Sequence, residues 1–258
     1  MSGAMYMVRV PFRGARLFEL ARRRGLKTHD HDQGYATHCA LRELFGDVAP
    51  QPFALEAPSG AIQPVLGYTT ADAATLREAA QLKADPWLWD HLVDWENLAA
   101  KPLPTAWREG QLLDFSVRAT PIARAAKDHP NPRRGPREPE FLHRQGSEVD
   151  VFLLACRAQD SLPDREALYR EWLHAQFARH GGASVERVEV ESFQIDRLSR
   201  RHHAEDARKT VKGRPDVTFS GTLTVRDPLA FRALLARGIG RHRAFGFGML
   251  LLRPPAVR

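Results

Sequence analysis

The sequence predicts an α+β protein built of two tandem units, each with its own antiparallel sheet. Three observations support this prediction. Each half of the chain shows the order strand–helix–strand–strand–helix–strand, its strands alternate apolar and polar residues, and Pro102, Pro104 and Gly110 separate the halves. This order is that of a ferredoxin-like or RRM-like unit. We therefore expect one such domain over residues 1–106 and a second over residues 111–258, with a cleft between their sheets.

The first unit opens with a strand at residues 5–12, where side chains alternate with a period of two. Helices follow over 13–25 and 32–45, because each carries an apolar stripe at helical spacing. The remaining elements are strands at 51–56 and 61–68 joined by a Pro-Ser-Gly turn, a helix at 71–84 and a last strand at 101–103. A predicted insertion around 70–98 contains the tryptophan-rich segment 85–95, which we expect to form core or subunit contacts rather than to stack on bases.

The second unit begins with an alternating strand at 112–121. Residues 127–146 are rich in Pro, Arg, Gly and His without an apolar period, so a long loop is expected there. The later elements are a helix at 163–179, strands at 185–195 and 217–225, a helix at 227–237 and a final strand at 249–252. Residues 197–214 between two of these strands are predicted to form the tip of a basic hairpin.

The composition is that of a globular protein with a basic surface. Hydrophobic residues make up 43% of the 258 residues, charged residues 27%, and the formal net charge is +7. No apolar run approaches the roughly 20 residues of a membrane helix, and no secretion signal is recognisable. The two cysteines, Cys39 and Cys156, lack metal-ligand spacing, which argues against a disulfide scaffold or zinc site and favours the cytoplasm. The charge favours a polyanionic partner, but composition leaves RNA, DNA and an acidic protein surface open.

A glycine-rich loop before the last strand carries the clearest motif, Gly238-Ile-Gly-Arg-His-Arg-Ala-Phe-Gly-Phe-Gly248. Glycine lacks a β-carbon, so it suits backbone that turns with positive φ or lies against a ligand. Free backbone N–H groups beside guanidinium groups can bind phosphate. A structural turn with solvated basic residues is an equally good interpretation. The loop is not a Rossmann fingerprint, because its glycines follow a helix and open a strand.

This region resembles the C-terminal signature of the CRISPR-associated repeat-RNA endonucleases, most closely the CasE branch of the RAMP superfamily. The matching residues run from Phe219-Ser-Gly-Thr-Leu-Thr-Val through the glycine loop to Met249-Leu-Leu-Leu. The strand at 112–121 resembles the family's Phe-x-Leu-Arg-Ala-Asn-Pro strand, with Thr120 where Asn is usual. The insertion and the arginine content leave open a counterpart from a type IV system, in which arginines would carry more of the catalysis.

Tyr35, His38 and Arg42 lie three and four residues apart, on one side of the predicted helix at 32–45. Spacing alone favours a surface or half-buried role for His38. The family carries a Tyr-x-x-His on this helix, and the resemblance therefore implies a catalytic role for Tyr35 and His38. In that role His38 would transfer a proton and Tyr35 would orient a group or donate a hydrogen bond, while Arg42, Arg241 and Arg243 would stabilise charge.

The residues predicted to bind RNA are basic side chains and loop glycines. They are Arg22, Arg23, Arg24, Lys27, Arg200, Arg201, Arg208, Lys209, Lys212, Arg214, Gly238, Gly240, Arg241, His242, Gly246 and Gly248. For residues 22–24 helix capping is an equal alternative, because cations are favoured at a helix C-terminus. For the hairpin the alternative is a solvated charged surface.

The resemblance implies a metal-independent endoribonuclease without a cofactor. The ribose 2′-OH is the nucleophile, so the products would be a 2′,3′-cyclic phosphate and a 5′-OH. The substrate would be CRISPR precursor RNA, cut within the repeat, and the enzyme would stay on the repeat hairpin as a subunit of the effector complex. The alternative is a non-catalytic RNA-binding scaffold subunit of such a complex.

Overall fold

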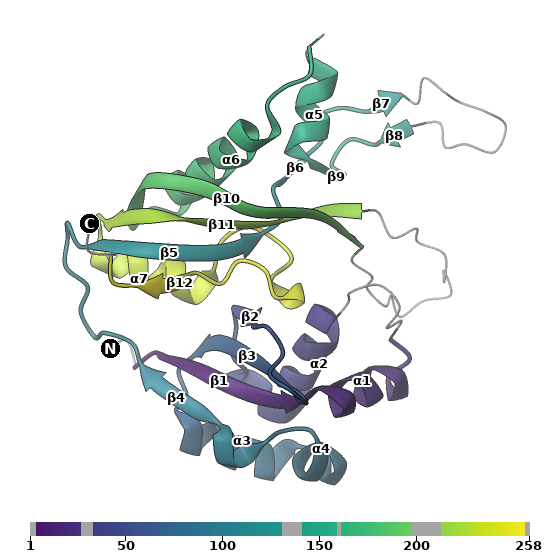
Figure 1. Ribbon diagram of the computed structural model, residues 1–258, viewed down its shortest axis with the longest axis vertical. Coiled ribbons are helices and arrows are strands. Elements are labelled where there is room, and N and C mark those ends of the chain that lie inside the picture. The colour runs from purple at the N-terminus through teal and green to yellow at the C-terminus, as the bar shows by residue number, and fades with distance from the viewer. Residues whose placement is uncertain (1–3, 27–32, 131–140, 159–160, 198–212, 256–258) are drawn as a thin grey trace, which may run out of the picture.

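The computed structural model describes residues 4–26, 33–130, 141–158, 161–197 and 213–255. Within these ranges each half of the chain forms a four-stranded antiparallel sheet (Figure 1). In both sheets the first strand of the half lies between its third and fourth strands. The predicted α+β fold with tandem ferredoxin-like halves is therefore confirmed.

The first half forms the sheet with the order β2-β3-β1-β4. Its elements are β1 (Tyr6–Arg13), α1 (Gly14–Arg23), α2 (Gln33–Phe45), β2 (Phe53–Leu55), β3 (Ile62–Thr69), α3 (Ala73–Lys83), α4 (Pro86–His91) and β4 (Ala99–Pro102), with short 3-10 turns at Gly46–Val48 and Trp95–Asn97. The alternation in β1 buries Val8, Val10 and Phe12 completely. These side chains pack against the apolar stripes of α1, α2 and α3, so the helices cover one face of the sheet.

The tryptophan-rich segment belongs to the core of the first half. Leu88, Leu92 and Val93 are buried, and the rings of Trp89 and Trp95 stack with centroids 4.4 Å apart. The segment therefore packs on the structure beneath it, as the sequence predicted.

The second half forms the sheet with the order β10-β11-β5-β12. Its elements are β5 (Leu112–Ala119), β6 (Ile122–Arg124), β7 (His129–Pro130), β8 (Phe141–His143), β9 (Glu148–Asp150), α5 (Val151–Ala158), α6 (Arg165–His180), β10 (Ala183–Arg197), β11 (Gly213–Val225), α7 (Pro228–Arg237), a 3-10 turn at Arg243–Phe245, called η3, and β12 (Leu251–Arg253). Buried side chains of β5 and β11 pack against α6 and α7, again on one face of the sheet.

The prediction of a structureless loop over 127–146 is wrong in part. β7 pairs with β8, and β6 pairs with β9 just outside the predicted loop. Strands of two or three residues are too short to show a period in the sequence. Helix α5 was not predicted, and Figure 1 shows it beside α6, beyond the face of the large sheet.

Several helices begin at an aspartate that caps them. Asp72, Asp85, Asp164 and Asp227 each accept a hydrogen bond from a backbone N–H in the first turn of α3, α4, α6 and α7. Such caps satisfy amides that have no partner within the helix. The α7 cap matters most here, because α7 leads directly into the glycine loop.

The two halves meet through apolar side chains. Met5 and Tyr68 from the first half join the hydrophobic core of the second. The Tyr68 hydroxyl is buried and donates a hydrogen bond to the Leu250 carbonyl at 2.6 Å. None of the helices in the described ranges is long and apolar enough to cross a bilayer.

Candidate active site

The start of α2 lies directly against η3 of the glycine loop. A β-carbon at Gly34 would overlap the backbone carbonyl of Phe245, so only glycine permits this approach. The Tyr35 ring stacks on Phe245 with centroids 5.3 Å apart and planes inclined by 26°. The two motifs selected from the sequence, which lie about 200 residues apart in the chain, therefore meet in the structure.

Four rings form a continuous row across this contact. His38 lies 6.1 Å from Tyr35 between ring centroids, and His242 lies 5.8 Å from Phe245 in an edge-on arrangement. Tyr35 and His38 are half-buried. The row therefore brings one imidazole from each half of the chain to the same junction.

The loop glycines have the predicted backbone conformation. Gly238, Gly240, Gly246 and Gly248 all have φ between 72° and 84°. His242 lies in the same left-handed region, with φ 60° and ψ 30°. This conformation is uncommon for a residue with a β-carbon and is held here by the surrounding loop.

The loop amides do not match the expectation of free N–H groups. Gly238 donates to the Leu234 carbonyl, and Gly248 donates to the Arg118 carbonyl, both at 2.7 Å. Gly246 donates to the Arg243 carbonyl at 3.3 Å. These three amides are used to shape the loop, so a bound anion would meet mainly its basic side chains.

Three side chains predicted to bind RNA converge on one carboxylate, that of Glu148 in β9. Arg241 lies 3.0 Å from one carboxylate oxygen, and Arg214 and His242 each lie 3.0 Å from the other. Arg214 also donates to the Glu148 backbone carbonyl at 3.5 Å. Sequence reasoning missed Glu148, because a single glutamate just after the expected loop at 127–146 gives no signal.

The charges in this cluster shift the proton affinities of its members. The pKa of His242 is lowered, because the effect of burial outweighs the opposite effect of the Glu148 carboxylate. Burial would raise the pKa of Glu148, but its cationic neighbours outweigh burial and hold it below the usual value. The lowered pKa of His242 favours its uncharged form at neutral pH. Arg214 and Arg241 then supply the permanent positive charge beside Glu148, and His242 adds to it when protonated.

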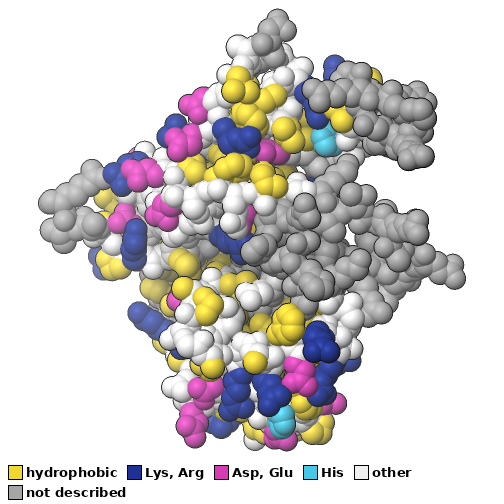
Figure 2. Space-filling view, turned by 45° about the vertical axis from the view of Figure 1, so that its right-hand side comes forward, with side chains coloured by type: hydrophobic (Ala, Val, Ile, Leu, Met, Phe, Trp, Pro, Cys, Tyr) yellow, Lys and Arg dark blue, Asp and Glu magenta, His cyan; other side chains and the backbone are white. Residues whose placement is uncertain are grey.

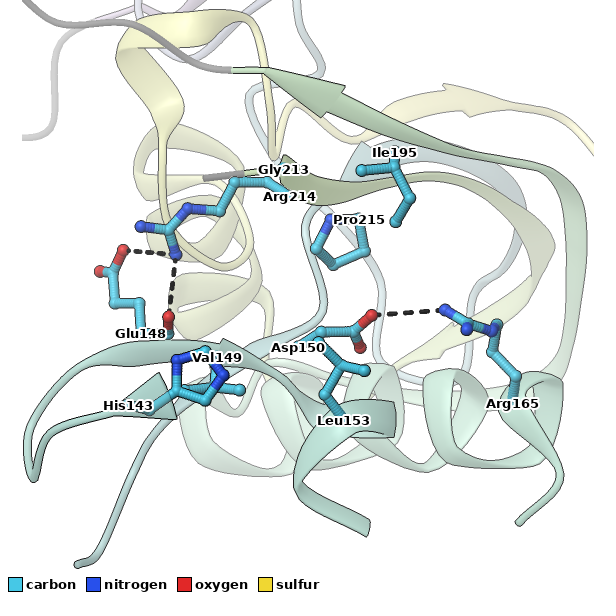
Figure 3. Close-up of a pocket in the computed structure, with 10 residues that line it drawn as sticks. All are labelled: His143, Glu148, Val149, Asp150, Leu153, Arg165, Ile195, Gly213, Arg214 and Pro215. Atoms are coloured by element: carbon cyan, nitrogen blue, oxygen red, sulfur yellow. Dashed lines mark hydrogen bonds and ion pairs between the residues drawn. The ribbon is translucent and has the colours of Figure 1, made fainter. Parts of the chain in front are cut away.

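A pocket of about 350 Å³ adjoins this cluster (Figure 3). It lies between β9, α5 and the β10–β11 hairpin, with Glu148 and Arg214 on one wall. On the other wall Arg165 lies 3.3 Å from Asp150, and the Tyr169 hydroxyl donates to the same carboxylate at 2.9 Å. Burial raises the pKa of Asp150 despite these partners. Val149, Leu153, Ile195 and Pro215 add apolar surface.

The arginines at the end of α1 have partners within the protein. Arg23 forms a 2.6 Å ion pair with Glu19, and Arg24 forms one of the same length with Glu43. The Arg23 guanidinium also lies 4.1 Å from the centre of the Trp87 ring. In Figure 2 the basic side chains of this half lie beside acidic ones rather than forming an unbroken basic surface. Exposed pairs of this kind contribute little energy, roughly 0–1 kcal/mol, so a phosphate can compete for them.

The remaining predicted site residues do not join the Glu148 cluster or the row of rings, or they lie outside the described ranges. Arg243 donates to the Arg237 carbonyl at the end of α7. Arg42 is about half exposed and lies 3.5 Å from Asp47. Arg22 is exposed. Those outside the described residues are Lys27, Arg200, Arg201, Arg208, Lys209 and Lys212.

A sequence profile of the CRISPR associated protein family matches residues 5–254. The chain belongs to this family. Its match covers both halves and the glycine loop, as the resemblance in the sequence implied. No curated protein sequence matches the chain.

Solved structures of CRISPR proteins share the fold. A structure of the CRISPR endoribonuclease Cse3 bound to 19 nt RNA is 23% identical, with a TM-score of 0.61, 98% of this chain covered and 100% of that one. Cas6e from Escherichia coli str. K-12 is 21% identical, with a TM-score of 0.59, 97% of this chain covered and 100% of that one. A chain of a CRISPR RNA-guided surveillance complex is 15% identical, with a TM-score of 0.52, 97% of this chain covered and 100% of that one. At these identities the likeness establishes the shared fold.

Proposed function

We propose that this protein is a metal-independent endoribonuclease that cleaves CRISPR precursor RNA within the repeat. The observation that carries the proposal is the packing of α2, with Tyr35 and His38, against the arginine-bearing glycine loop. The shared fold with RNA-bound Cse3 and with Cas6e supports the same assignment. Its place of action is then the cytoplasm, where the transcript is made.

The reaction needs no nucleophile from the protein. The ribose 2′-OH attacks the adjacent phosphorus, the bond to the 5′-oxygen breaks, and the products are a 2′,3′-cyclic phosphate and a 5′-OH. A base removes the 2′-OH proton and an acid protonates the departing oxygen. His38 performs one of these transfers, since an imidazole exchanges protons near neutral pH. Arg243 and Arg42 offer positive charge to the phosphorane that forms between the two steps.

Product retention completes the proposal. The enzyme stays on the repeat hairpin and enters the effector complex as a subunit. The likeness to a chain of a surveillance complex supports this, and it also supports the alternative of a non-catalytic RNA-binding scaffold subunit. The two functions differ in whether the bound RNA is cut.

Incubation of the purified protein with repeat RNA from its own genome, in excess EDTA, tests the proposal. Cleavage is expected to continue in EDTA and to stop when the scissile nucleotide carries a 2′-deoxyribose, because the nucleophile is then missing. The 5′ fragment is expected to end in a 2′,3′-cyclic phosphate by mass spectrometry. Tight binding of intact RNA without cleavage would establish the scaffold instead.

A further inference from the structure

The Glu148 cluster has the composition of an anion site that already holds an anion. Its basic side chains come from two separate elements, Arg214 from β11 and Arg241 and His242 from the glycine loop. A carboxylate presents two acceptor oxygens to guanidinium groups, and a phosphodiester presents two non-bridging oxygens in the same manner. The three side chains are therefore suited to either anion.

We propose that Arg214, Arg241 and His242 form a phosphate subsite for RNA, in which Glu148 holds the place of a backbone phosphate until RNA displaces it. The inference rests on the proposed function, since it assigns a contact to the same RNA.

The cluster is accessible to a ligand. The Glu148 side chain is 22% exposed and that of Arg241 is 46% exposed. Glu148 and Arg214 also line the pocket drawn in Figure 3. Glu148 belongs to the small β6–β9 pair rather than to the large sheet. Its carboxylate can therefore leave the cations by a side-chain rotation, without disturbing a ladder of the main sheet.

The charge balance allows the cluster to attract a phosphate. At neutral pH the two guanidinium groups exceed the single carboxylate by one positive charge. Removal of the carboxylate would leave both guanidinium groups to the phosphate. His242 also contacts Phe245, whose ring stacks on Tyr35. The subsite and His38 therefore lie at the two ends of the same row of rings.

Glu148→Gln tests the subsite, because it removes the competing charge and keeps the side-chain shape. We expect the variant to bind uncut repeat RNA more tightly than the wild type, by roughly three- to tenfold, the effect of one charge-assisted contact. A plot of the logarithm of the RNA association constant against the logarithm of the salt concentration should become steeper by about one phosphate contact. In the wild type the displaced Glu148 carboxylate takes up a cation from solution, which offsets one of the counterions that the RNA releases. RNA with a 2′-deoxyribose at the scissile nucleotide keeps cleavage from affecting the measurement.

The matched control is Glu186→Gln. Glu186 also lies 3.4 Å from an arginine, Arg226, but near the opposite end of the β10–β11 hairpin. It should leave RNA affinity unchanged. In Glu148→Gln, further replacement of Arg214 and Arg241 by Gln should abolish the gain.

Equal or weaker RNA binding by folded Glu148→Gln would overturn the subsite and make Glu148 a structural clamp. If Glu148→Gln does not fold, Arg241→Gln decides, because that side chain is half exposed. Weaker RNA binding by Arg241→Gln supports the subsite, and unchanged binding rejects it. Failure of the wild type to bind repeat RNA at all would reject the proposed function itself, which is a separate result.

Discussion

His38 and His242 place one imidazole from each half of the chain at the junction, but in different surroundings. His38 lies on α2 beside Tyr35. His242 has a left-handed backbone conformation, and its Nε2 lies 3.0 Å from a carboxylate oxygen of Glu148. Since a carboxylate accepts hydrogen bonds, the neutral imidazole carries its proton on Nε2 and donates a hydrogen bond to Glu148. We propose proton transfer to RNA for His38 and anion binding for His242.

His38→Ala is expected to lower the single-turnover cleavage rate by roughly 10²- to 10⁴-fold, the usual contribution of one general acid or base. RNA affinity should change little, because the side chain contributes no fixed charge. Gel-based cleavage assays and filter binding measure the two effects separately.

Arg243→Ala is the companion variant, since loss of a cation should weaken both binding and cleavage. Wild-type cleavage by His38→Ala would refute the acid–base assignment. If Arg243→Ala were then inactive, catalysis would depend on arginine, as expected of a type IV counterpart.

The pKa of His242 gives the stability of the protein a pH dependence. Burial lowers the pKa of this imidazole in the folded state, so the unfolded chain takes up the proton first as the pH falls below about 6.5. The contribution to the free energy of unfolding is therefore present above that pH and is lost on acidification. His242→Asn should show a smaller loss between about pH 7 and pH 5 in urea titrations, because Asn tolerates the left-handed backbone and does not titrate. Identical pH profiles for the two proteins would contradict this expectation.

At the scale of elements, the contact between α2 and η3 assembles the candidate site. Local rules position the parts of the chain that meet here. α2 carries an apolar face that includes the buried Leu41 and Leu44. α7 ends at Arg237, and Gly238 caps it and begins the loop that leads to η3. Their contact depends on Gly34, because the Phe245 backbone occupies the space of a side chain there. No periodicity in the sequence signals this requirement.

Gly34→Ala should separate α2 from η3 and slow cleavage more than it weakens RNA binding. The added methyl group meets backbone, which cannot move aside cheaply, so a loss of about 1–3 kcal/mol of stability is expected. Thermal unfolding and single-turnover cleavage are the measurements. Gly14→Ala is the control, because its β-carbon would lie 3.4 Å from the nearest atom, the Ala61 carbonyl oxygen, an ordinary contact. Full activity and stability in Gly34→Ala would show that the contact is dispensable.

At the scale of the whole molecule, the two halves are joined by a shared core. Tyr68 from β3 is 2% exposed and packs in the core of the second half. Its hydroxyl satisfies the carbonyl of Leu250, next to β12. The relative placement of the halves, and so of their two motifs, depends on contacts of this kind.

Tyr68→Phe should lower the free energy of unfolding by about 1–3 kcal/mol, because the Leu250 carbonyl loses its partner in a buried position. Urea unfolding followed by tryptophan fluorescence measures the change. Tyr6→Phe provides a matched substitution, because Tyr6 lies in β1 and its ring packs on the core of the first half. Equal effects of the two substitutions would mean that the hydrogen bond across the junction contributes nothing specific.

The sequence by itself determined the fold class, most element positions and the two motifs of the site. The signals it used are local, for example the strand alternation at Val8 and Val10 and the capping residue Asp227. Such signals can be read without knowledge of the fold. It also predicted the positive φ of the loop glycines. The short strands around Glu148 lay beyond its reach, because two or three residues show no period.

Only the tertiary structure decided which side chains meet. It brought Phe245 onto Gly34 and Tyr35, paired Arg24 with Glu43 of another helix, and gathered Arg214, Arg241 and His242 around Glu148. These contacts join segments up to about 200 residues apart in the chain, and their geometry follows from the packing of two whole sheets and their helices. A carboxylate inside a basic site is the kind of feature that such packing alone reveals, since its partners are neighbours in space and not in sequence.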